Sequence, residues 1–329
     1  MPNMEATIVR GYLQGVSLGY RAPEFINREI FPWLDMPSSR AKILTYNRGD
    51  QSRLEAKARA RGTEAATRTM KIDSIDVNTK QVAIKERITD EDIRDAGLPD
   101  NASPSMSLQQ DAIEMNARSL DMYREVAVRD AIFAATWADG NLGGEDAAGL
   151  WAPTDATNTF LTDIETALGN LTASGVGTTN LRLMLDYATF MKLNRVAEIR
   201  DRFKYTSDKS LSEQSLATML GIDRVLIAKS IRSTAREKKD GTDFTASNIW
   251  EKNAGKGSAF LYVYPSAPGL KTMAAGYQPR NKMPNGEYRL TKSYRREELS
   301  AWEYESQEDT GVVVTSPLAG YLWNDTIVT

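Results

Sequence analysis

The chain has 329 residues and a formal net charge of −3, and it contains neither cysteine nor histidine. This length suffices for one large or two medium domains, and the charge provides no global basic field for nucleic acid. The two missing residue types exclude disulfides and thiolate chemistry, and they remove the usual general base and the commonest metal ligand. No apolar run reaches the roughly 18 residues of a membrane span, and residues 1–20 lack the pattern of a secretory signal. We therefore expect a soluble protein, made inside the cell, without a membrane partner.

The first 40 residues have no sustained period, because glycines and prolines interrupt them. Between these breaks lies an apolar stretch with Phe25, Ile26, Phe31 and Trp33. A segment this apolar with so little regular structure usually lies along another surface, either of its own chain or of a neighbour. An ordinary strand and loop in the core is the alternative.

Residues 41–88 predict a long two-stranded projection. A short strand at 43–46 leads out, and alternation over 70–87 predicts a strand that leads back. The connecting stretch 48–71 holds seven basic against three acidic residues, a net charge of +4. Because an isolated hairpin is marginal in water, this projection must lean on a partner or be mobile.

The stretch 103–137 predicts one long helix with two apolar rows, glycine-free and opened by Ser103 and Pro104. At about 1.5 Å per residue it would span about 45 Å, the length of a strut. A capping cluster at 89–92 predicts a short helix just before it.

Residues 155–275 predict a compact mixed domain. We expect helices at 162–171, where Thr162 and Glu165 fit a capping box, at 187–199 and at 210–220. Strands are expected at 181–185, 225–228 and 259–264.

Past residue 286 the period returns to two, so further strands should pair with earlier ones and pack on the long helix. Six basic residues over 280–296 precede six acidic residues over 297–309. Such blocks of opposite charge suit head-to-tail contacts between subunits.

No motif predicts catalysis, so we expect no enzyme activity, no metal site and no cofactor. Gly15–Gly19 matches the serine-hydrolase elbow, but that chemistry needs a histidine base. Gly255–Ser258 fits a turn better than a phosphate loop, and Arg48–Asp50 spells an adhesion tripeptide that occurs by chance.

Acidic residues cluster at 90–92, 145–146 and 297–298, and they fit helix caps and solvated faces better than cation sites or acid–base pairs. The basic residues of 48–71 favour contact with protein over nucleic acid, because three acids interrupt them and no aromatic residue is present to stack on bases.

The order of these segments resembles the major capsid proteins of tailed bacteriophages with the Hong Kong 97-type fold. Five short stretches carry the resemblance: FINREIFPW at 25–33, the return strand at 70–91, Glu125-Val126-Ala127 in the long helix, DRFKY at 201–205, and SLATML at 215–220 before the strand at 225–227. The resemblance implies an α+β fold with an N-terminal arm (1–40), an extension loop (41–88), a peripheral domain (89–150 and 280–329) with a spine helix (103–137), and a mixed axial domain (151–279).

The resemblance also implies a structural protein of the virion that self-assembles, in the host cytoplasm, into an icosahedral shell around double-stranded DNA. Its partners would be other copies of itself in hexamers and pentamers, DNA through weak non-specific contact, and portal, scaffolding and decoration proteins. Because the chain starts almost directly with the arm, scaffolding is expected to be a separate protein. We predict inter-subunit contacts for these nine residues: Arg53, Lys57, Arg59, Arg61, Arg68, Phe25, Ile26, Phe31 and Trp33.

Two alternatives stay open. One is the shell protein of a non-viral nanocompartment with the same fold, and the other is a carboxylate-based hydrolase.

Overall fold

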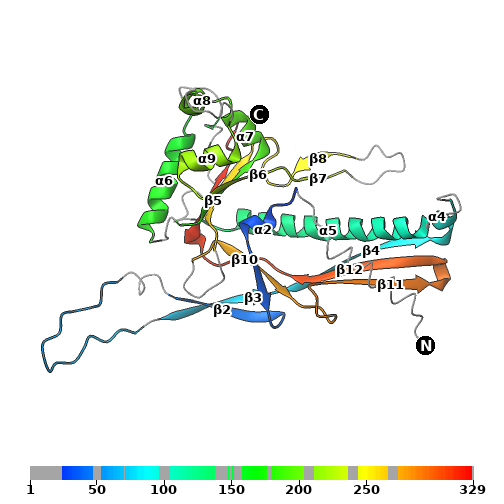
Figure 1. Cartoon of the computed structure of the whole chain (residues 1–329), viewed down its shortest axis with the longest axis horizontal. Coiled ribbons are helices and arrows are strands. Elements are labelled where there is room, and N and C mark those ends of the chain that lie inside the picture. Colours follow the sequence, from blue (N-terminus) through cyan, green and yellow to red (C-terminus); the bar gives the residue numbers. More distant parts are fainter. Residues whose placement is uncertain are drawn as a thin grey trace.

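The computed structural model describes eleven stretches of the chain: 24–46, 53–69, 71–95, 104–137, 147, 150–151, 158–175, 179–203, 211–235, 244–265 and 273–327. Figure 1 shows an elongated body that carries a long hairpin at one end and a more compact lobe on one side. The GxSxG stretch at 15–19, the tripeptide at 48–50 and the acidic pair at 145–146 lie outside these residues.

One sheet and one long helix build the peripheral part. The sheet contains β1 (Trp33–Met36), β4 (Lys80–Thr89), β10 (Gly276–Asn281), β11 (Arg289–Arg296), β12 (Ala301–Thr310) and β13 (Val313–Val314). At its centre β12 pairs antiparallel with both β11 and β4, as expected for strands that return to earlier ones. A small cluster of Ile88, Ala112, Ile113 and Tyr304 joins this sheet to the long helix.

The long helix, α5 (Pro104–Ala134), confirms the predicted strut, and the short helix α4 (Asp90–Asp95) precedes it. The buried face of α5 takes Ile113, Ala117 and Leu120 from one predicted row and Ala112 from the other, whereas Met115 is 64% exposed. The same buried face also carries polar side chains, which the apolar pattern did not predict. These are Asn116, Asp121, Arg124 and Glu125.

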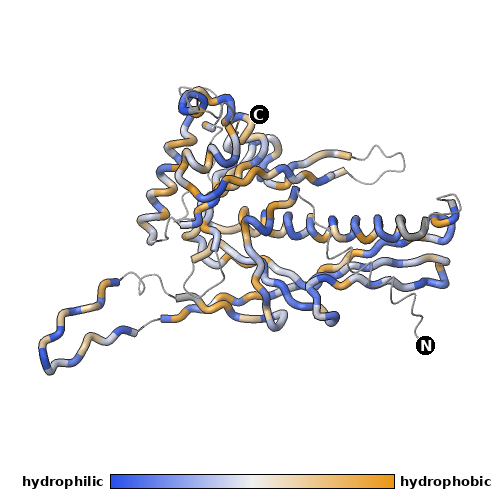
Figure 2. The backbone as a smooth tube through the Cα atoms, viewed as in Figure 1, coloured by the Kyte–Doolittle hydropathy of each residue, from blue (hydrophilic) through white to orange (hydrophobic). Residues whose placement is uncertain are grey.

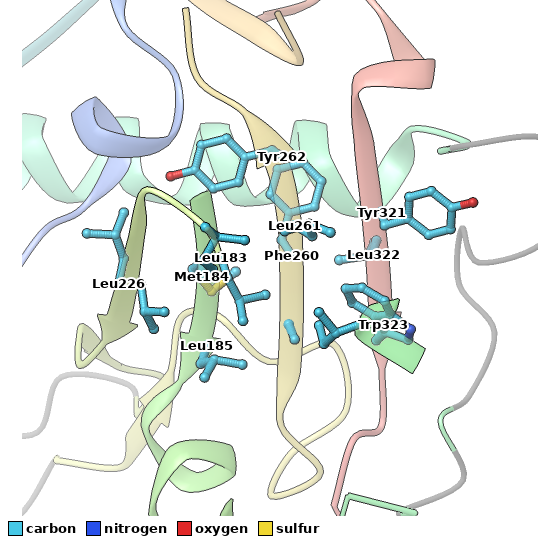
Figure 3. Packing of buried hydrophobic residues seen from close by; sticks show 14 of the residues in the cluster. Leu183, Met184, Leu185, Leu226, Phe260, Leu261, Tyr262, Tyr321, Leu322 and Trp323 are labelled. Atoms are coloured by element: carbon cyan, nitrogen blue, oxygen red, sulfur yellow. The ribbon is translucent and has the colours of Figure 1, made fainter. Parts of the chain in front are cut away.

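We call the compact lobe the axial part. Its sheet has the order β14-β9-β5-β6. The strands are β5 (Leu181–Asp186), β6 (Arg224–Ala228), β9 (Ser258–Val263) and β14 (Gly320–Asn324). Figure 3 shows their apolar side chains packed together, and they form the centre of the main core. Every residue of β9 and β14 is buried, which explains their unbroken apolar runs.

Four helices and a small hairpin complete the axial part. They are α6 (Phe160–Ala173), α7 (Tyr187–Leu193), α8 (Ala197–Phe203), α9 (Glu213–Leu220), β7 (Ile231–Ser233) and β8 (Ala246–Asn248). Two expectations were wrong in detail. The helix expected at 187–199 is broken into α7 and α8, and α6 begins at Phe160, so that Thr162 lies inside it rather than capping it.

The projection is a hairpin of β2 (Arg40–Tyr46) and β3 (Ile72–Asn78), and among the described strands these two pair only with each other. The return strand expected over 70–87 is divided at Thr79, where the partner changes from β2 to β12. The chains are crowded there: a Cβ at Gly311 would lie 2.6 Å from the Asn78 carbonyl oxygen. Hydrophilic residues predominate at the far end of the projection (Figure 2).

Two segments cross between the parts. The short helix α2 (Asn27–Ile30) leads into β1, which pairs parallel with β10. The predicted boundary assigned 280–329 to the peripheral domain, whereas β14 pairs with β9 in the axial sheet. The axial core is therefore completed by residues from near the end of the chain.

Prediction from the fold. Gly276→Ala should destabilise the protein by about 1–3 kcal/mol, because the new Cβ would lie 2.6 Å from the Val313 carbonyl oxygen and 2.7 Å from the Phe31 ring. The measurement is the free energy of unfolding in urea. Gly169→Ala is the matched control: it lies in α6 with no atom within 4 Å of the new methyl group, so it should be neutral or stabilising. Equal effects of the two substitutions would contradict the packing argument.

Candidate assembly surfaces

The N-terminal arm is held by a carboxylate of the long helix. Glu125 is fully buried and accepts hydrogen bonds from the backbone N–H groups of Ile26 (3.2 Å) and Asn27 (2.8 Å). It also accepts from Trp250 Nε1 (2.6 Å) and Ser230 Oγ (3.2 Å), which belong to the axial part. Burial raises the pKa of Glu125, and the hydrogen bonds from Trp250, Ile26 and Asn27 act in the opposite direction by stabilising the carboxylate. One side chain therefore joins the arm, α5 and the axial part.

Further polar contacts seat the arm on its own chain. The Glu29 carboxylate lies 2.9 Å from both Arg182 Nη1 and Arg224 Nη1, and its backbone carbonyl accepts from the Tyr262 hydroxyl (2.8 Å). The Gln278 amide donates to the carbonyl oxygens of Asn27 (2.9 Å) and Phe31 (2.7 Å). The sequence left two surfaces open for this segment, that of its own chain and that of a neighbour. In the structure the segment lies on its own chain.

The four predicted arm residues differ in exposure. Phe31 is fully buried in the main core, so it offers no surface to a neighbour. Phe25 and Ile26 are half-buried against the same core. Trp33 is also half-buried, with the Arg280 guanidinium 3.5 Å and the Arg28 guanidinium 4.5 Å from its ring centre.

Four buried charges connect α5 to the peripheral sheet. Asp121 and Arg124 of α5 form a closed ring of ion pairs with Arg289 of β11 and Glu308 of β12, and each of the four side chains is only 5–7% exposed. The Arg289–Asp121 pair is 2.9 Å and the Arg124–Glu308 pair 3.1 Å. Burial lowers the pKa of Arg124 to about 10, against the opposing effect of Glu308. With two charges of each sign, the ring is neutral.

A second ionic cluster lies on the other face of the sheet. Glu303 of β12 pairs with Arg87 (2.8 Å), Lys85 (3.0 Å) and Arg296 (3.5 Å). Hydrogen bonds from Arg87 and Lys85 lower the pKa of Glu303 to about 2. The charge blocks expected to serve contacts between subunits thus pair largely within one chain, because the β11–β12 hairpin brings them side by side.

The extension loop is the most exposed feature. All residues of 53–69 are exposed except Glu55, which is half-buried and lies 3.7 Å from Arg53 and 3.6 Å from Arg68. In the described part of the chain, no ion pair involves Lys57, Arg59 or Arg61. Apolar side chains are exposed along the same projection: Leu44 by 45%, Leu54 by 90% and Ile72 by 56%. The structure therefore brings the five predicted basic residues together on one solvent-exposed loop.

The axial part contains a second buried acid. Asp186 caps α7 by accepting from the Ala188 N–H (3.0 Å), and it also accepts from the Asn248 side chain. Burial raises its pKa to about 6. The turn expected at Gly255–Ser258 is confirmed: Gly255 and Gly257 have φ values of 78° and 65°, and the Gly255 N–H donates to Glu251.

The described residues contain neither a metal-binding cluster nor a membrane-spanning helix. No group of three or more acidic side chains there could hold a metal ion. Within the same residues, no helix is both long and apolar enough to cross a membrane.

Several of these residues escaped sequence reasoning. A signal for Asp121, Arg124 and Glu125 was present, because charged residues on the apolar face of a helix need buried partners. Glu29 and Gln278 gave no such signal, since they lie in short segments without a period.

Prediction from the buried ring. Glu308→Gln should destabilise the protein by about 3–5 kcal/mol, because it leaves Arg124 and Arg289 buried without a full counter-charge. Urea unfolding measures the loss. Glu298→Gln, at an exposed position, should change the stability by no more than about 0.5 kcal/mol. A loss below 1 kcal/mol for Glu308→Gln would show that the ring is dispensable.

Prediction from Asp186. A raised pKa in the folded state gives stability that is complete below the unfolded value and is lost as the pH rises through about 6. The stability of the wild type relative to Asp186→Asn should therefore fall by about 2 kcal/mol between pH 4 and pH 7. Glu303→Gln is the control: the lowered pKa of Glu303 makes its contribution smaller at pH 4 than at pH 7, so the difference should change in the opposite direction. A pH-independent difference for Asp186→Asn would refute the assignment.

Comparison with known proteins identifies the fold. No family profile matches the sequence, and no curated protein matches it. Among solved structures, a phage-related protein from Bordetella bronchiseptica is 19% identical with a TM-score of 0.69, over 97% of this chain and 98% of that one. The mature capsid of bacteriophage PhiM1 is 12% identical with a TM-score of 0.55, over 94% and 90%.

A third similar structure is a virus-like particle from Pyrococcus furiosus, 10% identical with a TM-score of 0.51, over 96% of this chain and 98% of that one. The likeness covers nearly the whole chain, and the second and third of these structures are described as a phage capsid and a virus-like particle. The chain has the Hong Kong 97-type major capsid fold, an α+β fold, as its sequence predicted.

Proposed function

We propose that this chain is a structural subunit that self-assembles into an icosahedral shell enclosing double-stranded DNA. The observation that carries the proposal is the extension loop, a long exposed projection whose two strands pair with no other strand in the described part of the chain. The capsid fold of the remaining chain supports the same role. The proposed role is structural, without catalysis or a cofactor.

A two-stranded projection of this kind cannot build a packed core of its own. A two-stranded hairpin is marginally stable in water, and exposed apolar side chains such as Leu44 and Ile72 stabilise it only when another surface covers them. Its own body lies at the other end of the hairpin (Figure 1). A neighbouring copy supplies the missing surface, and repetition of that contact builds a closed shell.

We assign the contact to the exposed members of the predicted set. The basic residues Arg53, Lys57, Arg59, Arg61 and Arg68 lie on the loop. The half-buried arm residues Phe25, Ile26 and Trp33 offer a second, smaller surface, and Phe31 is omitted because it is buried within its own chain.

In this proposal the copies form hexamers and pentamers in a virion assembled in the host cytoplasm. Portal, scaffolding and decoration proteins are the further partners, and contact with the enclosed DNA is weak and non-specific because the chain carries a net negative charge.

A second candidate is the shell of a non-viral nanocompartment. The likeness to the virus-like particle from Pyrococcus furiosus favours this candidate, although at lower similarity than the phage-related protein. The contents of purified particles separate the two: nuclease-protected double-stranded DNA supports the capsid, and an enclosed protein with no DNA supports the compartment.

Prediction from the loop. Arg59→Glu combined with Arg61→Glu should reduce the yield of shells at least tenfold or lower their melting temperature, because it reverses unpaired charges at the proposed contact. Size-exclusion chromatography with light scattering and electron microscopy measures assembly. Arg59→Lys with Arg61→Lys keeps the charge and should assemble normally. Normal shells with unchanged heat stability from the charge-reversed protein would exclude this contact.

A further inference from the structure

A pocket lies where the N-terminal arm meets the long helix and the peripheral sheet. Its volume is about 200 Å³, and its lining comes from α2, β1, α5, β10, β11 and β12. One ordered water needs only about 10–15 Å³ of such space, so the pocket has room for a larger group.

Four guanidinium groups from four different elements line this pocket. They belong to Arg28 of α2, Arg124 of α5, Arg280 of β10 and Arg289 of β11. The lining contains two acidic residues, Glu308 and Asp309, so its net charge is +2. Asp35 pairs with Arg280 (2.6 Å) and Asp121 lies 3.9 Å from Arg28, but these two acids are not part of the lining. Burial, and to a lesser extent the other three guanidinium groups, lower the pKa of Arg124. An anion placed among these groups would offset their mutual repulsion.

Buried polar atoms without a hydrogen-bond partner concentrate in the same lining. Two are donors, Trp33 Nε1 and Arg124 Nε, and two are acceptors, Gln278 Oε1 and Asp309 Oδ1. They are four of the ten such atoms in the described part of the chain. Because native structures leave few buried polar groups unpaired, their concentration at one pocket indicates a ligand that pairs with them.

The two acceptors have fixed identities. The Gln278 amide nitrogen donates to the carbonyl oxygens of Asn27 (2.9 Å) and Phe31 (2.7 Å), so the remaining amide atom is the oxygen. Asp309 accepts from Ser39 Oγ through Oδ2 (3.2 Å), which leaves Oδ1. Since an ionised carboxylate can only accept hydrogen bonds, the group that pairs with Oδ1 has to supply a proton.

Hydrogenphosphate meets both requirements. Its oxygens accept from guanidinium and indole N–H groups, and the planar fork of arginine matches phosphate geometry. Inorganic phosphate also keeps at least one proton at neutral pH, and that proton can be donated to an acceptor such as Asp309. Sulfate has no proton at this pH, and neither has the phosphodiester of a nucleic acid.

We propose that this pocket binds one inorganic phosphate ion in a protonated form. The four guanidinium groups and the Trp33 indole hold its oxygens, and the Asp309 carboxylate accepts its O–H group. Because Arg28 and Trp33 belong to the arm, the bound ion joins the arm to α5 and to the peripheral sheet. The site lies within a single chain, so the proposal goes beyond shell formation and does not depend on it.

Calorimetric titration of the full-length protein tests the choice of anion. The probes are sodium phosphate, sodium sulfate and sodium dimethyl phosphate at neutral pH and matched ionic strength, so that general screening is the same for all three. The wild type should bind phosphate about tenfold or more tightly than either of the others, since each of these leaves Asp309 Oδ1 unpaired. Equal affinities for phosphate and sulfate, or no phosphate binding in the millimolar range, would overturn the proposal.

Substitutions test the location. Arg28→Gln removes one charge from the lining and should weaken phosphate binding about tenfold. Arg118→Gln is the matched control, because Arg118 is a partly exposed arginine of α5 that pairs with the arm residue Glu24 (2.8 Å) outside the pocket. It should leave the affinity within about twofold of the wild type. Phosphate binding that Arg28→Gln leaves unchanged would place the ion elsewhere and refute the site.

Asp309→Asn tests the hydrogen bond itself. The new amide can donate to sulfate, so the affinities for phosphate and sulfate should come to within about threefold of each other. A merely structural role of Asp309 would weaken both anions equally and keep their ratio, which would count against the proposal. The free energy of unfolding without phosphate shows whether each variant is folded.

Thermal melting gives an independent readout. Phosphate should raise the melting temperature of the wild type more than sulfate does, and this difference should disappear in Arg28→Gln. Both anions stabilise proteins generally, so the difference between them is the quantity that counts. Binding of dimethyl phosphate as tight as that of phosphate would assign the pocket to a nucleic-acid backbone instead. Loss of assembly in Arg28→Gln, when the wild type binds no phosphate, would assign it to an acidic side chain of a neighbouring copy.

Discussion

The buried Glu125 carboxylate is the interaction on which the arrangement of the molecule depends. Four donors from the arm and the axial part converge on it, and all are neutral: two backbone N–H groups, an indole and a hydroxyl. An ionisable group buried in this way requires hydrogen bonds to offset the loss of water, so its position and those of its partners specify one another. The long helix, the arm and the axial part therefore adopt one mutual orientation.

The two parts of the molecule are stabilised differently. The axial part has a continuous core in which four strands are covered by apolar side chains (Figure 3). The peripheral part has only a small apolar cluster, because one helix on one sheet encloses little volume. The ring of Asp121, Arg124, Arg289 and Glu308 replaces the missing core there. Buried ion pairs of this kind add little net stability, but the loss of one partner is strongly destabilising because it leaves the other charge buried and uncompensated.

Sequence patterns predicted the elements better than their partners. Local periodicity predicted the spine helix, strands β5, β6 and β9, and the projecting hairpin. The order of these segments then indicated the fold. The position of the arm did not follow from local patterns, because contacts such as that of Asn27 with Gln278 join residues 251 positions apart in the sequence. The basic and acidic blocks were expected to face neighbours, yet the register of β11 with β12 sets Arg289 opposite Glu308. The five basic loop residues lie on one exposed loop because a single short segment carries them all, and their contact with a neighbour stays a prediction.

The division of the return strand at Thr79 has a mechanical consequence. On the far side of that residue β3 runs for seven residues, about 23 Å, and of the described strands β2 alone pairs with it. A rotation of about 10° at this joint would displace the far end of β3 by about 4 Å while every contact of Glu125 and of the charged ring stays in place. The hairpin can thus rotate about Thr79 as one unit while the rest of the molecule keeps its structure. If copies of the chain assemble as proposed, rotation at this joint lets the loops of chemically identical chains meet their neighbours at different angles.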